Sequence, residues 1–427
     1  MVVTKKISTI NIFSLILYAI LASLPLLLVN SVSDLPISIS NWESKVIDIL
    51  NLNFPEDNFY PPGPAILILP FSWLIPKYFM IIFIYYLFSV ILYFFICNEI
   101  NDKRFRLLAL MALPLNPALV WYCYSSSDTV FELFLLMLLV YCSIKNKIFL
   151  FNFSGLLLTQ TRPAHWLTYL GISIYFLIKR KGLPKRLKRW RNYSAAFILL
   201  IATIITNFLV YGSFSVATVS GMNLYIANNK YAYLAHPKYD IEVFLTKGQH
   251  LELEPKFELS TNDPGRSRQY TRMAVDSIRD NPKEFTIATM QKIESYVFGI
   301  QKIPNLSGDY FLSADGKSII IGEPRLKWAL IGGHVFYEIY RGLLLIFLFI
   351  SLGVYFVINK STNYFENIRD NLAIFSIPWL LGFIPAILFF SDTRYKVVSE
   401  VILVPFILLV LQSVTINNHK KVQLNLV

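Results

Sequence analysis

The chain has 427 residues, of which 55% are hydrophobic and 15% are charged, and its mean hydropathy is +0.52. An ordinary soluble domain is more polar. Apolar runs of about 20 residues, each long enough to cross a bilayer as a helix, recur along the whole sequence and indicate a polytopic membrane protein. The net charge of +12 does not indicate nucleic-acid binding, because the Lys and Arg residues lie in short loops between apolar runs and there determine topology.

The first apolar run, from about 10 to 29, follows two lysines and has no small-x-small cleavage site after it. We therefore expect a retained helix that starts in the cytoplasm. Residues 30–77 then form the first loop on the far side, which is rich in acids. This loop contains Tyr60-Pro61-Pro62-Gly63-Pro64, which cannot lie inside a regular helix. The apolar residues 64–76 are too short and too proline-rich to span, so we expect them to lie at the membrane interface.

The remaining apolar runs alternate across the membrane, and basic loops set their orientation. The strongest of these loops, 179–191, has eight Lys or Arg residues and no acid. A long polar segment, 212–330, is expected outside, and both chain ends in the cytoplasm. The predicted fold is a single all-α membrane domain, 1–427, with about ten spans. The predicted spans are 10–29, 78–98, 107–122, 129–144, 148–160, 164–178, 194–211, 338–358, 371–390 and 398–416. Two helices outside the membrane are predicted over 266–280 and 283–298, separated at Asn281-Pro282.

Four polar clusters fall at the outer face of this topology, and ionisable groups at such positions tend to mark function. Arg and Lys side chains facing a cavity suit a phosphate group, and a carboxylate opposite them suits a general base for a sugar hydroxyl. Each group also has a structural interpretation, because a loop acid is often merely solvated and a basic side chain can extend toward lipid headgroups. The clusters are the first loop, 125–128, 161–165 and 391–396. The ionisable candidates in them are Asp34, Glu43, Arg162, Arg394 and Lys396.

No metal site is predicted. The three cysteines have no CxxC partner, and His165, His236 and His334 are isolated along the chain. No DxD pair for a metal-bound nucleotide is evident, so we expect neither a metal nor a cofactor.

Six short segments, taken in order, resemble the GT-C glycosyltransferases, which are polytopic enzymes that use polyprenyl-phosphate sugars. This family includes protein O-mannosyltransferases and the aminoarabinose transferase of lipid A. The order, spacing and common membrane face of the segments carry the resemblance. The segments are YPPGPAILILP (60–70), LPLNPALVWYCYSSSD (113–128), TRPAHWL (161–167), FLVYGSF with SGMNLYIANN (208–229), IRDNPKEF (278–285) and DTRYK (392–396).

The resemblance implies an inverting sugar transfer, with a first-loop carboxylate as base and with Arg162, Arg394 and Lys396 holding the lipid phosphate. Asp34 is the first candidate base. It lacks the following Tyr and small residue that the family usually shows, so Glu43 stays open as the alternative. The partners implied are a polyprenyl-phosphate sugar, membrane lipid and a glycan, lipid or protein acceptor. The residues expected to line the cavity are Tyr60, Ser126, Asp128, His165, Asn223, Asp392 and Tyr395.

The implied location is the bacterial inner membrane, with the active site facing the periplasm. The size and the basic loops suit a bacterial or phage-encoded enzyme that modifies O-antigen. Two other classes stay open. A polymerase or ligase of surface polysaccharide normally has two large outer loops rich in Arg. A flippase or transporter predicts inverted repeats and charges at the bilayer midplane.

Overall fold

The computed structural model describes fourteen stretches of the chain, and almost all of their residues are helical. One short antiparallel hairpin, β1 (Tyr310–Leu312) and β2 (Ser318–Ile320), is the β structure of the described part. The all-α prediction is confirmed in this coarse form. The described stretches are 12–32, 40–51, 62–125, 127–179, 201–209, 220–235, 266–297, 310–312, 318–320, 336, 339–351, 353, 364–388 and 393–424.

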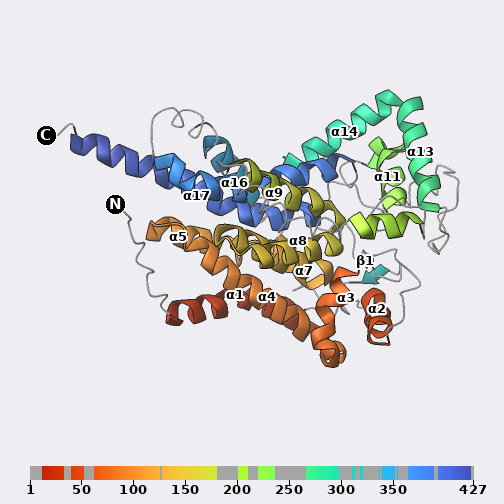
Figure 1. Ribbon diagram of the computed structural model, residues 1–427, viewed down its shortest axis with the longest axis horizontal. Coiled ribbons are helices and arrows are strands. Elements are labelled where there is room, and N and C mark those ends of the chain that lie inside the picture. The colour runs from red at the N-terminus through yellow and green to blue at the C-terminus, as the bar shows by residue number, and fades with distance from the viewer. Residues whose placement is uncertain are drawn as a thin grey trace.

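The described helices pack side by side in one assembly (Figure 1), and the most extensive helix pairs are α7 with α8, α16 with α17, α11 with α13 and α4 with α7. Residues 201–209 and Ile339–Ser351 are also helical. The labelled helices are α1 (Ile12–Val32), α2 (Ser40–Leu50), α3 (Gly63–Ile68), η1 (Leu69–Lys77), α4 (Tyr78–Cys97), α5 (Lys103–Met111), α6 (Pro117–Ser125), α7 (Ser127–Ile144), α8 (Ile148–Thr161), η2 (Pro163–His165), α9 (Trp166–Lys179), α11 (Ser220–Asn228), η3 (Ala232–Ala235), α13 (Arg266–Asp280), α14 (Pro282–Val297), α16 (Tyr364–Leu388) and α17 (Thr393–Leu424).

Two described helices, Ile12–Ser31 and Tyr78–Cys97, are long and apolar enough to cross a membrane. Pro117–Tyr124 and Asp128–Ile144 together give a third candidate if this pair, bent by 119°, is one broken span. Four shorter apolar helices accompany them: Gly63–Ile75, Ile148–Thr161, Ile339–Ser351 and Leu372–Leu388. The count of about ten spans stays a prediction.

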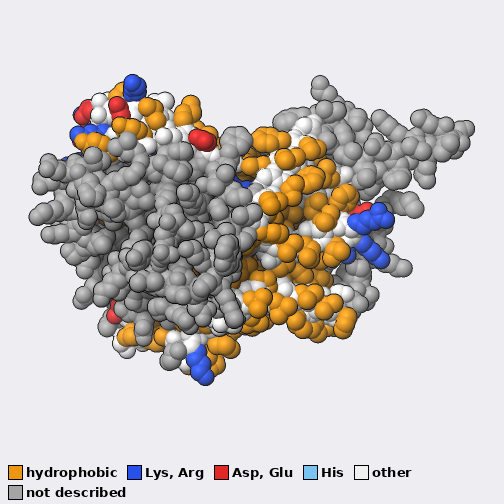
Figure 2. Space-filling model, turned by 180° about the vertical axis from the view of Figure 1, so that it is seen from behind, with side chains coloured by type: hydrophobic (Ala, Val, Ile, Leu, Met, Phe, Trp, Pro, Cys, Tyr) orange, Lys and Arg blue, Asp and Glu red, His pale blue; other side chains and the backbone are white. Residues whose placement is uncertain are grey.

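Large apolar side chains remain exposed on the described helices, as expected of a protein that faces lipid. Figure 2 shows a broad area of hydrophobic side chains over the half of the molecule away from α13. Soluble monomers rarely expose so much contiguous apolar surface to water. The exposed side chains of α1 alone include Ile12, Phe13, Ile16, Leu17, Ile20, Leu21 and Leu28.

The predicted span 107–122 is wrong, because the chain leaves the helix after Met111 and starts α6 only at Pro117. Pro114 and Pro117 have no backbone N–H, so neither can continue a helix without losing a hydrogen bond. The helix predicted over 398–416 also begins earlier than predicted. Since α17 starts at Thr393, the residues 394–396 lie in its first turn rather than in a loop before it.

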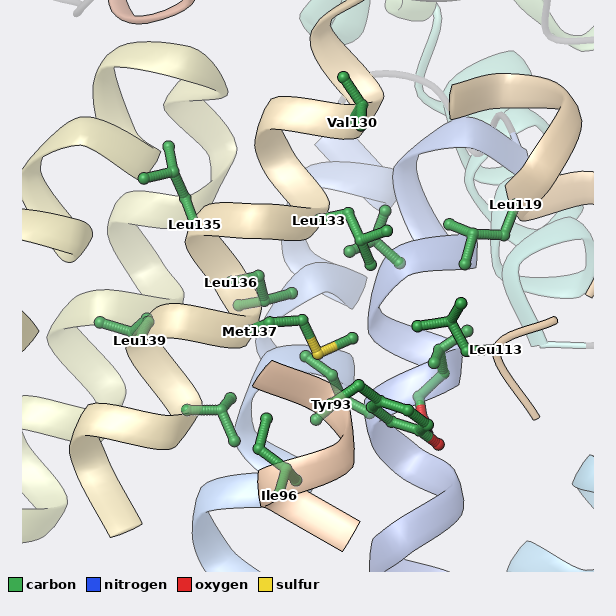
Figure 3. Close-up of a cluster of buried hydrophobic side chains, with 14 of the residues drawn as sticks. Tyr93, Ile96, Leu113, Leu119, Val130, Leu133, Leu135, Leu136, Met137 and Leu139 are labelled. Atoms are coloured by element: carbon green, nitrogen blue, oxygen red, sulfur yellow. The ribbon is translucent and has the colours of Figure 1, made fainter. Parts of the chain in front are cut away.

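The helices that pack around α7 share one apolar core. Tyr93 from α4, Leu113 from the break before α6, and Met137 from α7 lie close together (Figure 3). The phenol of Tyr93 is fully buried and donates a hydrogen bond to Ala109 O, at 2.9 Å. This bond satisfies the one polar atom of a buried aromatic side chain and joins α4 to α5.

The two ends of the helical assembly carry different segments. In Figure 1, α2, α3, α11, α13 and α14 gather at one end, whereas α5 and the last turns of α17 lie at the other. At the α5 end, Lys145 Nζ lies 2.7 Å from Glu99 Oε1, which joins the turn after α7 to the turn after α4. The segments predicted to be outside therefore share one end, and two loops predicted to be cytoplasmic share the other.

Gly63 docks the first loop on the end of α8. A Cβ atom at Gly63 would lie 2.5 Å from the carbonyl carbon of Gln160 and 2.5 Å from Thr161 Oγ1. The backbones of α3 and α8 therefore approach as closely as glycine allows, and Gly63 of the first loop rests directly against Thr161 at the end of α8.

We predict that Gly63→Ala lowers the free energy of unfolding by about 1–3 kcal/mol, because the added methyl group overpacks this contact. Gly342→Ala is the matched control, since no atom lies within 4 Å of a Cβ there. Removing a helical glycine at that site should be neutral or stabilising by up to about 1 kcal/mol. Denaturant titration of the two purified variants in detergent compares them, and equal effects would contradict the close approach.

Candidate functional site

A buried charged cluster lies where the start of α7 meets the turn between α8 and α9. Asp128 and Glu132 are one turn apart on α7 and share a face of the helix. Arg162 follows α8 directly, and His165 ends η2. Together with Thr129, these side chains form the charge cluster to which we refer below.

The local sequence explains why Arg162 leaves the helix. It precedes Pro163, and a residue before proline avoids the helical region. Arg162 is accordingly extended, with φ −133° and ψ 101°. Its backbone N–H still donates to Leu158 O at 2.8 Å, and His165 N donates back to Arg162 O at 3.0 Å. The result is a tight turn that presents Arg162 and His165 toward α7.

Glu132 is the centre of the charge cluster. Its Oε1 lies 2.7 Å from His165 Nε2, and its Oε2 lies 2.8 Å from Arg162 Nε. The Nε–Oε2 contact is an ion pair by distance, although its alignment falls short of a hydrogen bond. Arg162 Nη2 also lies 3.2 Å from Asp128 Oδ2 and donates to Thr129 Oγ1 at 3.2 Å. The turn between α8 and α9 thus contacts the first two turns of α7 through Arg162 and His165.

Most of the charge cluster is buried, which strengthens its electrostatic contacts. Asp128 differs from the other members because its side chain is more exposed. The side chains of Glu132, Arg162 and His165 are 1%, 7% and 7% exposed, whereas Asp128 is 28% exposed. Two carboxylates face one guanidinium, so the cluster has a net charge of −1 when His165 is neutral. Asp128 is the member that an incoming ligand would reach first.

The structure brings three of the predicted site residues together: Asp128, Arg162 and His165. Asn223 lies on α11 and is half-buried, and Lys396 is fully buried in the first turn of α17. Glu43, Arg394 and Tyr395 lie in described helices, but their side chains are outside the described part. Asp34, Tyr60, Ser126 and Asp392 lie outside the described residues altogether.

Sequence reasoning missed Glu132. Its signal was present, because it is the one ionisable side chain in the apolar run 129–144 apart from a tyrosine and a cysteine, and it lies four residues after Asp128. An acid inside an apolar helix calls for a partner, and spacing of four residues places it beside Asp128.

A second buried ion pair joins the predicted span 338–358 to the predicted last span, and Arg341 also reaches the end of α14 in the segment predicted to be outside. Arg341 Nε donates to Glu400 Oε1 at 3.0 Å, and both side chains are at most 3% exposed. Arg341 Nη2 also donates to the carbonyl oxygens of Tyr296 and Val297, which end α14. These carbonyls have no partner within their own helix, so Arg341 caps α14.

Within the described residues, no group of three or more His, Cys, Asp or Glu side chains is arranged as metal ligands. Cys97, Cys123 and Cys142 are buried free thiols. The chain matches no family model, no curated protein and no solved structure.

We predict that Glu132→Gln lowers the free energy of unfolding by about 3–5 kcal/mol, because it removes the most deeply buried carboxylate that Arg162 contacts. Glu99→Gln is the control, since it breaks an ion pair of similar length at a site where the Lys145 side chain is 42% exposed. That change should cost less than about 1 kcal/mol. Denaturant titration in detergent measures both, and a Glu132→Gln protein as stable as the wild type would contradict the central role of this carboxylate.

Proposed function

We propose that this protein is a membrane glycosyltransferase of the GT-C type, which moves a sugar from a polyprenyl phosphate to an acceptor hydroxyl on the outer side of the bacterial inner membrane. The single observation that supports this most is the position of the charge cluster. It lies at the end of the helical assembly where the first-loop helix α3 docks, and where the other segments predicted to be outside also gather (Figure 1).

The position of the charges beside the first loop favours a transferase over a transporter. A transporter binds its substrate near the bilayer midplane, at broken helices, and the bend of 119° between α6 and α7 is a feature that both classes could share. The feature that favours a transferase is the first loop, whose Gly63 packs on Gln160 and Thr161 beside the charge cluster. Here Asp128 is the second residue of α7, and Arg162 directly follows the last residue of α8. Both therefore lie at helix ends, where a lipid-linked donor and an acceptor from outside could meet.

The contacts in the charge cluster also suggest which basic residues bind the donor phosphate. Because two carboxylates, those of Asp128 and Glu132, already face the guanidinium of Arg162, we assign the donor phosphate chiefly to Arg394 and Lys396. These two residues lie in the first turn of α17, where the helix dipole adds to their positive charge. Arg162 then serves mainly to hold the two carboxylates and the turn after α8.

In the proposed reaction, the carboxylate of Asp34 or Glu43 accepts the proton of the acceptor hydroxyl. The oxygen of this hydroxyl attacks the anomeric carbon, and the bond from that carbon to the phosphate oxygen breaks. Polyprenyl phosphate leaves with the bonding electrons, and the sugar is transferred with inversion. No resident metal or cofactor is needed for this step. The cavity residues proposed beside these groups are Tyr60, Ser126, Asp128, His165, Asn223, Asp392 and Tyr395.

The test is the release of polyprenyl phosphate by purified protein in lipid nanodiscs supplied with a panel of polyprenyl-phosphate sugars and a surface-glycan extract as acceptor. We predict that either Asp34→Asn or Glu43→Gln reduces kcat by about 10²–10⁴-fold, which is the usual contribution of a general base. Asp48→Asn on the same first-loop helix as Glu43 is the control and should retain activity.

Full turnover in both Asp34→Asn and Glu43→Gln would contradict the assignment of the base. Absence of lipid phosphate release across the panel, from protein that unfolds cooperatively, would contradict the proposed function itself.

A further inference from the structure

Lys292 is a fully buried amine at the junction of three helices. It lies on α14 and has no exposed surface. Its Nζ donates to Asn228 Oδ1 of α11 at 2.8 Å and to Ile387 O of α16 at 3.1 Å. Asn228 Nδ2 in turn donates to Leu388 O at 2.7 Å. The last two carbonyl groups of α16 thus receive their hydrogen bonds from the outer segment rather than from their own helix.

Tyr296 makes the second half of this contact, one turn further along α14. Its hydroxyl donates to Trp379 O of α16 at 2.9 Å, and its ring packs edge-on against Phe383 at 5.3 Å. Gly382 leaves room for it, since a Cβ there would lie 2.9 Å from the hydroxyl oxygen. Lys292 and Tyr296 of α14, together with Asn228 of α11, thus bind the C-terminal part of α16. We call this set of contacts the α14 seat.

Both acceptors of the Lys292 amine are neutral, which is unusual for a buried lysine. The elements around Lys292 carry other ionisable side chains, but none of these is a hydrogen-bond partner of its amine among the described residues. The described part of α16 has its ionisable residues within 364–370, about 25–35 Å along the helix from Ile387 at 1.5 Å per residue. The others are Tyr225 on α11, Tyr233 on η3, and Lys283, Glu284, Glu294 and Tyr296 on α14 itself. Arg341 also contacts the end of α14, where it donates to Tyr296 O, and its charge is paired with that of Glu400.

Burial alone lowers the pKa of Lys292 from 10.5 to about 7. An exposed amine strongly prefers to be charged, and moving it out of water favours the neutral form. A neutral amine keeps two N–H groups, so both acceptors remain satisfied after the proton is lost.

We propose that the α14 seat is controlled by protonation of Lys292: the neutral amine stabilises the docked α14, and the charged amine loosens it. Four residues separate Leu388, the last residue of this contact, from the start of α17, so the contact governs how firmly the segment predicted to be outside holds α16 and α17 together. This inference does not depend on the proposed reaction.

The direction of the pH effect follows from proton linkage. When α14 is undocked, Lys292 is exposed and keeps its usual pKa, so the undocked form binds more protons between about pH 7 and pH 10.5. Docking therefore strengthens as the pH rises through this range, and the gain from pH 6 to pH 8 is about tenfold.

Hydrogen–deuterium exchange of the whole protein in detergent tests this. The measured quantity is the protection of peptides within 282–297 at pH 6 and at pH 8, corrected for the intrinsic exchange rate at each pH. We expect about tenfold greater protection at pH 8 for the wild type. Lys292→Met should show the same protection at both pH values, and Lys292→Arg, which stays charged, should show low protection at both.

Lys283→Met is the matched control, because Lys283 is an exposed lysine on the same helix, and it should keep the wild-type difference. Equal corrected protection of the wild type at the two pH values would overturn the proposal, and this comparison needs no variant to fold. A tenfold difference that persists in Lys292→Met would also overturn it.

Discussion

One buried carboxylate, that of Glu132, holds the described half of the candidate site together. It contacts both Arg162 and His165, which belong to the turn between α8 and α9, from its own position on α7. Such a carboxylate is costly to bury alone, and the same is true of the guanidinium that it meets. Neither helix end can therefore move without exposing an uncompensated charge. Since Gly63 packs on the backbone of Gln160 and Thr161, the placement of the first loop depends on the same turn.

The two ends of the molecule differ in the kind of polar contact they make. At the α5 end, the ion pair of Lys145 with Glu99 is partly exposed and contributes little to stability. At the opposite end, the charge cluster and the pair of Arg341 with Glu400 are buried, and each joins segments far apart in the sequence. Costly buried charges collected at one end of an apolar helical assembly are the feature that the proposed transferase explains best. The α14 seat lies at that end too, so the outer segment is held by polar contacts that respond to pH.

The sequence predicted the bounds of several helices well. A long apolar run, or a proline at a helix boundary, leaves few positions at which a helix can begin or end. The span 78–98 is α4, and the helices on either side of Asn281-Pro282 are α13 and α14, which begin and end within one residue of the prediction. Pro282 opens α14 at a position where its missing N–H costs nothing. The site was harder to predict. The partners of Glu132 lie about 30 residues further along the chain, and those of Lys292 lie on α11 and α16, so only the packing of the helices brings them together. The early start of α17 was missed because Thr393–Lys396 has no apolar pattern, although nothing in it opposes a helix.

The most direct measurement is photo-crosslinking of the wild-type protein in nanodiscs with a polyprenyl-phosphate sugar analogue that carries a diazirine on the sugar, followed by peptide mapping. We predict that the label falls on peptides around 125–132, 160–168 and 392–396, and that an excess of the polyprenyl-phosphate sugar without a diazirine reduces this labelling. Competed labelling confined to the opposite end, on the peptides around 98–106 and 145–147, would contradict it.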